Sequence, residues 1–95
     1  MFVFSLHYLA PLDEIDALLP AHREWLATQR DAGHFLAWGR KVPREGGMIF
    51  ARASSREDAE RLANSDPFVV AGAARSEVIE FDPAFVLPGL EALRG

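Results

Sequence analysis

The pattern of apolar and polar residues predicts four short β-strands, and in the first of them alternate residues share a face. The first stretch covers residues 2–8, and its large side chains share one face: Phe2, Phe4, Leu6 and Tyr8. Further strands are predicted at residues 34–38, 48–53 and 74–81. The third strand is apolar on both faces, as in strands covered on both sides, whereas the charges of the fourth favour a sheet edge.

Two other stretches have apolar residues at the spacing of a helix face. In the first, this face consists of Leu18, His22, Trp25, Leu26 and Gln29. Because proline fits only near the start of a helix, Pro20 predicts a regular helix that begins around Leu18 or Leu19 and stops at Gly33. The second helix follows a capping serine, either Ser54 or Ser55. Its narrow inner face is formed by Ala59, Leu62 and Ala63.

The sharpest local pattern in the chain is the segment of residues 64–72. Asp66 is predicted to be the N-cap of a short helical turn, Pro67 its first residue, and Gly72 the left-handed residue that ends it. On these residues alone, Asp66 is either only a cap or an acid presented to a cleft at a tight junction. A capping aspartate still has a second oxygen that it can offer to a histidine.

The order strand, helix, strand, strand, helix, strand predicts a ferredoxin-like α+β fold with an antiparallel sheet. In this βαββαβ arrangement the first and third strands are central, and both helices cover one face. An open apolar face is unfavourable in a monomer, so we expect a homodimer in which two sheets pack face to face, a dimeric α/β barrel. Residues 1–83 form the domain. The apolar tail, residues 84–95, contains a predicted short helix after Pro88 and should dock on its own domain or on the partner.

Composition narrows the class of protein. The chain has 95 residues, 49% of them hydrophobic, which predicts a single small domain. It has no cysteine, which excludes disulfides and thiolate metal sites. A net charge of −4 without a basic stripe argues against nucleic acid as a partner. The apolar N-terminus is too short for a membrane span and lacks a basic signal region, so we expect a cytoplasmic protein.

The three histidines are the other candidates for chemistry. His22 lies on the inner helix face, either as a satisfied core histidine or as a proton-transfer group. His7, near the end of the first strand, is either an exposed polar residue or part of a pocket rim or dimer interface. His34 is predicted to lie on the surface near a helix end. Their spacing matches no metal-ligand motif, and no Gly-rich phosphate loop is present, so no metal or other cofactor is expected.

The chain resembles the YciI-like, or YCII-related, family over roughly residues 2–83. The resemblance rests on short matches in order: Pro20-Ala21-His22, Gly33, Gly39, residues 55–63, Asp66-Pro67-Phe68 and Ala71-Gly72. It implies a dimeric ferredoxin-like protein in which His22 and Asp66 form a catalytic pair. Family members often have an arginine three residues before this histidine, where this chain has Leu19. Arg23 and Arg40 are candidate replacements for binding an anionic substrate.

These observations favour a small cofactor-independent enzyme. His22 and Asp66 would act as a general acid–base pair in an elimination, isomerisation or related proton transfer on a small, cyclic or aromatic substrate. The candidate substrate-binding residues are His7, Trp38, Arg40 and Phe68, with Trp25 and Tyr8 as further aromatic walls. The alternative is a non-catalytic dimeric module that binds a small ligand or a protein. A third hypothesis is a cofactor-free monooxygenase acting on an electron-rich aromatic compound.

Overall fold

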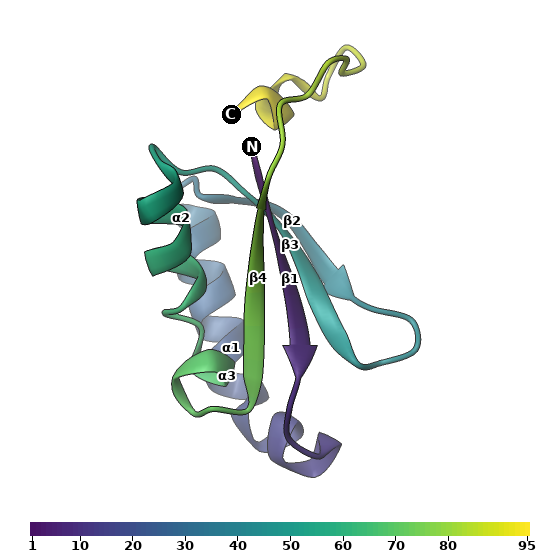
Figure 1. Ribbon diagram of the computed structural model, residues 1–95, viewed down its shortest axis with the longest axis vertical. Coiled ribbons are helices and arrows are strands. Elements are labelled where there is room, and N and C mark those ends of the chain that lie inside the picture. The colour runs from purple at the N-terminus through teal and green to yellow at the C-terminus, as the bar shows by residue number, and fades with distance from the viewer.

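The computed structural model describes residues 1–95, with an apolar core between one sheet and one layer of helices (Figure 1). The strands are β1 (Phe2–Tyr8), β2 (Phe35–Arg40), β3 (Gly46–Ala51) and β4 (Ala74–Glu80). The helices are α1 (Leu12–Asp31), α2 (Arg56–Ala63) and the short α3 (Pro67–Val70), and a 3-10 turn, η1, spans Glu91–Arg94. The element order therefore agrees with the order predicted from the sequence.

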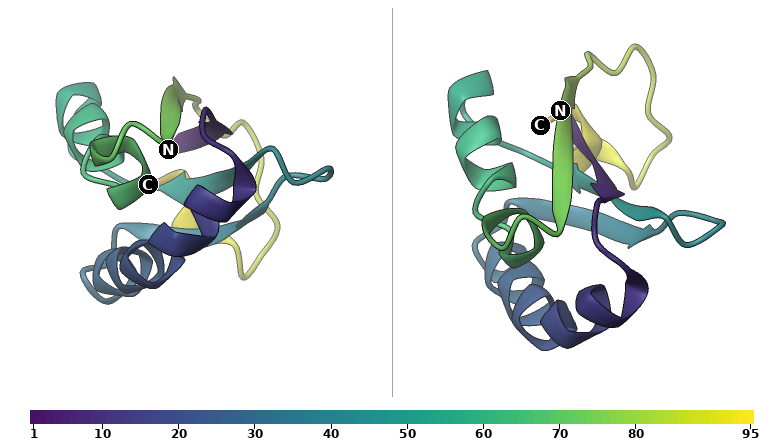
Figure 2. Two further views of the ribbon diagram at one scale, coloured as in Figure 1. Left: turned by 90° about the horizontal axis from the view of Figure 1, so that it is seen from below. Right: turned by 60° about the horizontal axis from the view of Figure 1, so that its bottom comes forward.

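The four strands form one antiparallel sheet in the order β2-β3-β1-β4. This order confirms the predicted ferredoxin-like fold, including the central positions of the first and third strands. All three helices lie on one side of the sheet (Figures 1 and 2). The alternation in β1 explains this arrangement, because the face with Phe2, Phe4 and Leu6 packs in the buried core cluster beneath the helices.

Helix α1 differs from the prediction at its start. It begins at Leu12 and continues through Pro20, so the expected beginning around Leu18 or Leu19 is wrong. Proline removes one helix hydrogen bond, but Ile15 in the added turns is 0% exposed and packs in the core cluster. Burial of this side chain offsets the lost bond. Figure 2 shows α1 changing direction along its length, as expected of a helix with an internal proline.

Strands β2 and β3 extend closer to their connecting loop than the sequence indicated. The predicted strands were residues 34–38 and 48–53, whereas the ladder pairs Trp38 with Ile49 and Arg40 with Gly47. The amide of Lys41 donates to the carbonyl of Gly46, which closes the ladder around a short loop. This register places the Arg40 side chain on the helix-covered side of the sheet, the side that Trp38 and Ile49 also face.

Gly46 is the point of closest approach between β3 and β1. A Cβ atom added there would lie 1.8 Å from the carbonyl oxygen of Leu6, a backbone atom that cannot move aside. We expect Gly46→Ala to lower the free energy of unfolding by about 1–3 kcal/mol in urea titrations. Gly39→Ala is the matched control, because a Cβ there meets no atom within 4 Å. Equal stability of the two variants would contradict this packing.

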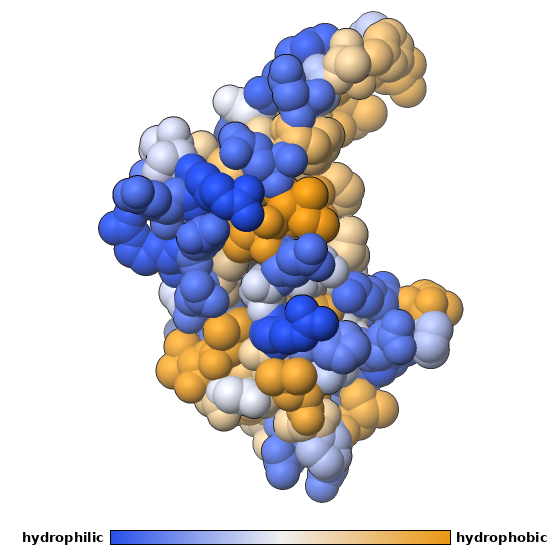
Figure 3. Space-filling view, in the orientation of Figure 1, coloured by the Kyte–Doolittle hydropathy of each residue, from blue (hydrophilic) through white to orange (hydrophobic).

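The sheet face opposite the helices has no covering layer. The side chains of Val3, Met48, Phe50 and Ile79 share it, together with polar and charged residues of β1 and β4. The tail after β4 projects past the end of the sheet (Figure 1), and its apolar colour continues beyond the domain in Figure 3. Phe85 and Leu87 in this tail are 74% and 58% exposed. None of the helices combines the length and apolar character required to cross a membrane.

Candidate active site

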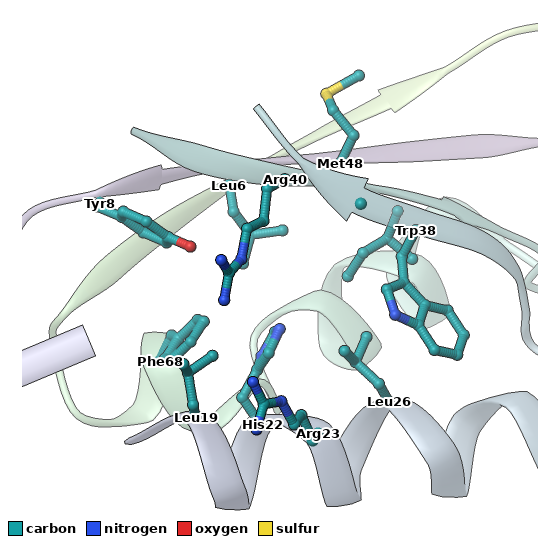
Figure 4. A pocket seen from close by; sticks show the side chains of 13 residues that line it. Leu6, Tyr8, Leu19, His22, Arg23, Leu26, Trp38, Arg40, Met48 and Phe68 are labelled. Carbon is teal, nitrogen blue, oxygen red and sulfur yellow. The ribbon is translucent and has the colours of Figure 1, made fainter. Parts of the chain in front are cut away.

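A cavity of about 340 Å³ lies between α1 and the helix-covered face of the sheet (Figure 4). This volume falls within the range of sites for small organic molecules. Its lining comes from β1, α1, β2, β3 and α3: Leu6, Tyr8, Leu19, His22, Arg23, Leu26, Trp38, Gly39, Arg40, Gly47, Met48, Ile49 and Phe68. The walls are mainly apolar, although the side chain of Met48 points away from the cavity to the open face of the sheet (Figure 4), and the polar groups are few and come from separate elements.

The junction before α3 fixes the carboxyl group of Asp66. The side-chain oxygen Oδ1 accepts a hydrogen bond of 2.9 Å from the amide of Phe68, and Pro67 opens the turn. Gly72 has a φ of 72°, in the left-handed region that glycine adopts without strain. The predicted capping turn is therefore confirmed, and it leaves Asp66 only 1% exposed.

His22 and Asp66 form a hydrogen bond across the interface of α1 and α3. The Nδ1–H group of His22 donates to Oδ1 of Asp66 at 2.8 Å. Oδ1 thus accepts two hydrogen bonds, one from the Phe68 amide and one from His22. The sequence had suggested the second oxygen as the acceptor for the histidine. The second oxygen, Oδ2, is buried without a partner. With Nδ1 carrying the proton, the neutral ring has an unprotonated Nε2, which makes no hydrogen bond within the chain.

Aromatic packing holds the imidazole ring in place. The ring of His22 stacks on that of Phe68 with centroids 4.0 Å apart and planes 14° from parallel. Tyr8 in turn packs its edge on Phe68 at 5.9 Å. One turn along α1, the indole N–H of Trp25 donates to the hydroxyl of Ser65 at 2.9 Å, which ties α1 to the residue preceding Asp66. The histidine and its acid are therefore fixed relative to each other by neighbouring contacts.

The lining of the cavity contains two charged residues, and each is an arginine. Arg23 belongs to α1 and Arg40 to β2. Just outside the lining, Arg44 donates to Asp16 at 2.5 Å. This hydrogen bond lowers the pKa of the Asp16 carboxyl group, and the charges of Arg44, Arg40 and Arg23 act in the same direction. The carboxylate, helped by the Tyr8 hydroxyl, raises the pKa of Arg44.

The structure brings most of the sequence-predicted site residues together and separates one of them, His7. Trp38, Arg40 and Phe68 line the same cavity as His22. His7 does not, because it follows Leu6 in β1 and therefore faces the opposite side of the sheet, where it pairs with Gly46 and Arg75. The side chain of His7 is exposed on the open face, outside the lining of this cavity.

The sequence also predicted positions for Trp25 and His34. Trp25 supports the site through Ser65 and Phe35 and is not part of the wall. His34 is exposed, as predicted, and its ring pairs with the side chain of Gln29 at 2.8 Å. The sequence did not predict the Asp16–Arg44 pair, because the helix was expected to begin only around Leu18 or Leu19. The continuous helix brings Asp16 one turn before Pro20, beside the loop that follows β2.

Comparison with known proteins agrees with the fold. A solved structure with a similar fold is 5-chloro-2-hydroxyhydroquinone dehydrochlorinase from Burkholderia phenoliruptrix, in complex with 2,5-dihydroxybenzoquinone. The TM-score is 0.70 with 17% sequence identity, over 85% of this chain and 93% of that chain. No curated protein matches the sequence. The family described as the YCII-related domain matches residues 1–82, and the chain therefore belongs to the YCII-related domain family.

Proposed function

We propose that the protein is a small cofactor-independent enzyme that moves a proton on a small ring compound by means of the His22–Asp66 pair. The observation that carries this proposal is the arrangement around His22. Its Nδ1–H group is bound to a buried carboxylate, while its free Nε2 belongs to a side chain that lines the cavity. This is the arrangement that general acid–base catalysis by histidine requires.

The proposed step is an elimination. Nε2 of His22 takes a proton from the ring substrate, the electron pair of the broken bond forms a new double bond, and the leaving group departs with its own electron pair. Asp66 holds the required tautomer and stabilises the imidazolium ion that results. The carboxylate is only 1% exposed, so its charge acts on the ring with little screening by water.

The similar fold of the dehydrochlorinase supports this class of reaction. Loss of hydrogen chloride from a hydroxylated ring is an elimination, and the ligand in that structure is itself a small ring with two hydroxyl groups. A ring of this size suits a cavity of about 340 Å³. We propose that Phe68 and Trp38 bind the faces and edges of such a ring and that Arg40 binds an oxygen substituent. His7 has no part in this proposal.

Chloride release from a set of chlorinated hydroxyhydroquinones tests the proposed reaction. We expect the wild-type chain to release chloride without added metal or other cofactor and to form the corresponding hydroxyquinone, as followed by nuclear magnetic resonance. The control is the same incubation with the His22→Gln variant. If the ring compounds bind to the wild-type chain but remain unchanged, the protein is the non-catalytic binding module instead.

We also propose that the protein is a homodimer in which the open sheet face and the tail of each copy are covered by the other. The open face carries Val3, Phe50 and Ile79, and the exposed Phe85 and Leu87 of the tail lie beyond the end of the same sheet. Ile79, Phe85 and Leu87 are exposed, and large exposed apolar surface marks an interface in soluble proteins. In a dimer with a two-fold axis, this surface of one chain packs against the same surface of the other chain.

Light scattering at micromolar concentration tests the dimer, with a mass of two chains expected. The double substitution Phe85→Ser and Leu87→Ser should raise the dissociation constant of the dimer by about tenfold or more, because each apolar side chain loses its buried contact. Val42→Ser is the matched control, since Val42 is 97% exposed in the loop between β2 and β3. A monomer mass for the wild-type chain would contradict the dimer, and an unchanged dissociation constant would exclude the tail from the interface.

A further inference from the structure

The cavity has a positive charge in a protein whose net charge is −4. Its lining includes Arg23 and Arg40 but no aspartate or glutamate. The nearest acid of the proposed mechanism, Asp66, is buried behind His22 and bound to it. A ligand in the cavity therefore meets two guanidinium groups and no exposed carboxylate of the wall.

Both cavity arginines lack a partner within the chain, in contrast to most other arginines of the protein. Hydrogen bonds to side chains or carbonyl groups are made by Arg30, Arg44, Arg52, Arg56, Arg61 and Arg94. No such bond is made by Arg23 or Arg40. Arginine presents a rigid set of donors suited to carboxylates and similar anions, so these two side chains are free to bind one.

A nearby acid does not cancel this charge. Asp16 already accepts a hydrogen bond from Arg44, and the charges of Arg40 and Arg23 also lower its pKa. Asp16 is therefore already paired with Arg44, and it makes no hydrogen bond with Arg23 or Arg40. Positive charge of this kind in the lining of a cavity attracts anions and favours their binding inside.

The directions of the side chains place this charge close to the proposed catalytic histidine. In Figure 4, Arg40 extends from β2 into the cavity toward Phe68 and His22, and Arg23 lies beside His22 on α1. A ring packed on the wall near Phe68 could direct a negative oxygen to Arg40 and keep an adjacent ring atom near His22. Arg40 is well placed to orient the ring and does not itself need to exchange a proton.

We propose that the cavity selects anionic ring compounds, namely ionised hydroxyquinones, phenolates or ring carboxylates, whose negative oxygen is bound by Arg40 and Arg23. This inference rests on the proposed function for the position of the site, but it concerns what the site binds. Neutral rings of the same shape lack the charged acceptor that the two arginines require, and they should bind more weakly.

Binding of matched probes to the full chain tests this selectivity by isothermal titration calorimetry. The anions are 2,5-dihydroxybenzoquinone, ionised at neutral pH, and benzoate; their neutral counterparts are 2,5-dimethoxybenzoquinone and benzamide. We expect each anion to bind about 10- to 100-fold more tightly than its counterpart. Arg40→Gln and Arg23→Gln should each weaken binding of the anions by about tenfold or more and leave the neutral probes unchanged.

The control is Arg30→Gln, which removes the same charge from α1 at an exposed position outside the cavity. This variant should bind all four probes as the wild-type chain does. Equal binding of anionic and neutral probes, failure of both anions to bind, or unchanged anion binding by Arg40→Gln would overturn the inference. The test is independent of turnover: loss of anion binding in the arginine variants with full activity of His22→Gln would overturn the proposed function alone.

Discussion

His22→Gln is expected to lower kcat by about 10²–10⁴-fold, the contribution that a positioned general acid–base group makes to a rate. A glutamine amide takes up no proton near pH 7, so the variant loses the proposed base. The fold should remain, because His22 is not a member of the buried core cluster and its ring lies at the cavity wall. We therefore expect a large fall in kcat and only a small change in the free energy of unfolding.

Steady-state kinetics and urea unfolding of the same variant distinguish this outcome from a structural effect. His34→Gln is the matched control, because it replaces the same residue type at an exposed position outside the cavity. This control should have wild-type kcat. Full activity of His22→Gln would exclude it as the base, and failure of His22→Gln to fold would identify a structural histidine instead.

Substitution of Asp66 should reduce both stability and activity, because its Oδ1 accepts the hydrogen bond that caps α3 and the hydrogen bond from His22. Asp66→Ala removes the acceptor of the Phe68 amide and of the His22 Nδ1–H group. We expect the free energy of unfolding to fall by about 2–4 kcal/mol, the combined effect of a lost cap and an unsatisfied buried donor. Chemical denaturation of the purified variant measures this loss.

Asp66→Asn separates the cap from the charge. Its amide oxygen can still accept both hydrogen bonds, and asparagine caps helices as well as aspartate does. Its NH₂ group, however, would occupy the place of the buried Oδ2, which has no partner, so some stability is lost. The negative charge that stabilises the imidazolium ion is gone, and kcat should fall by about 10²–10⁴-fold.

Ser55→Ala is the control, because it removes a helix cap that has no proposed role in catalysis. Ser55 caps α2 by accepting a hydrogen bond of 3.1 Å from the amide of Asp58, and it lies outside the cavity. Its loss should cost about 0.5–2 kcal/mol of stability with no change in kcat. If Asp66→Asn also kept full kcat, Asp66 would be a structural cap only.

Local patterns were sufficient to predict most of the elements. The alternation of Phe2, Phe4 and Leu6 identified a central strand, and the Asp66-Pro67 pair identified a capped turn. These predictions succeed because strand faces and helix caps depend on neighbouring residues. The start of α1 was mispredicted for the opposite reason. The cost of Pro20 is local and visible in the sequence, whereas the burial of Ile15 that offsets it depends on distant residues.

The candidate site also combines features that the sequence predicts with features that depend on tertiary packing. The sequence by itself identified His22, Asp66, Trp38, Arg40 and Phe68 as residues with suitable chemistry, with the pairing of the first two implied by family resemblance. Only the tertiary structure placed two donors on one oxygen of Asp66, turned His7 to the opposite face of β1, and brought two unpaired arginines into one cavity. His22 and Asp66 are 44 positions apart. Their contact depends on how α1 and α3 pack on the sheet, and no local periodicity encodes that packing.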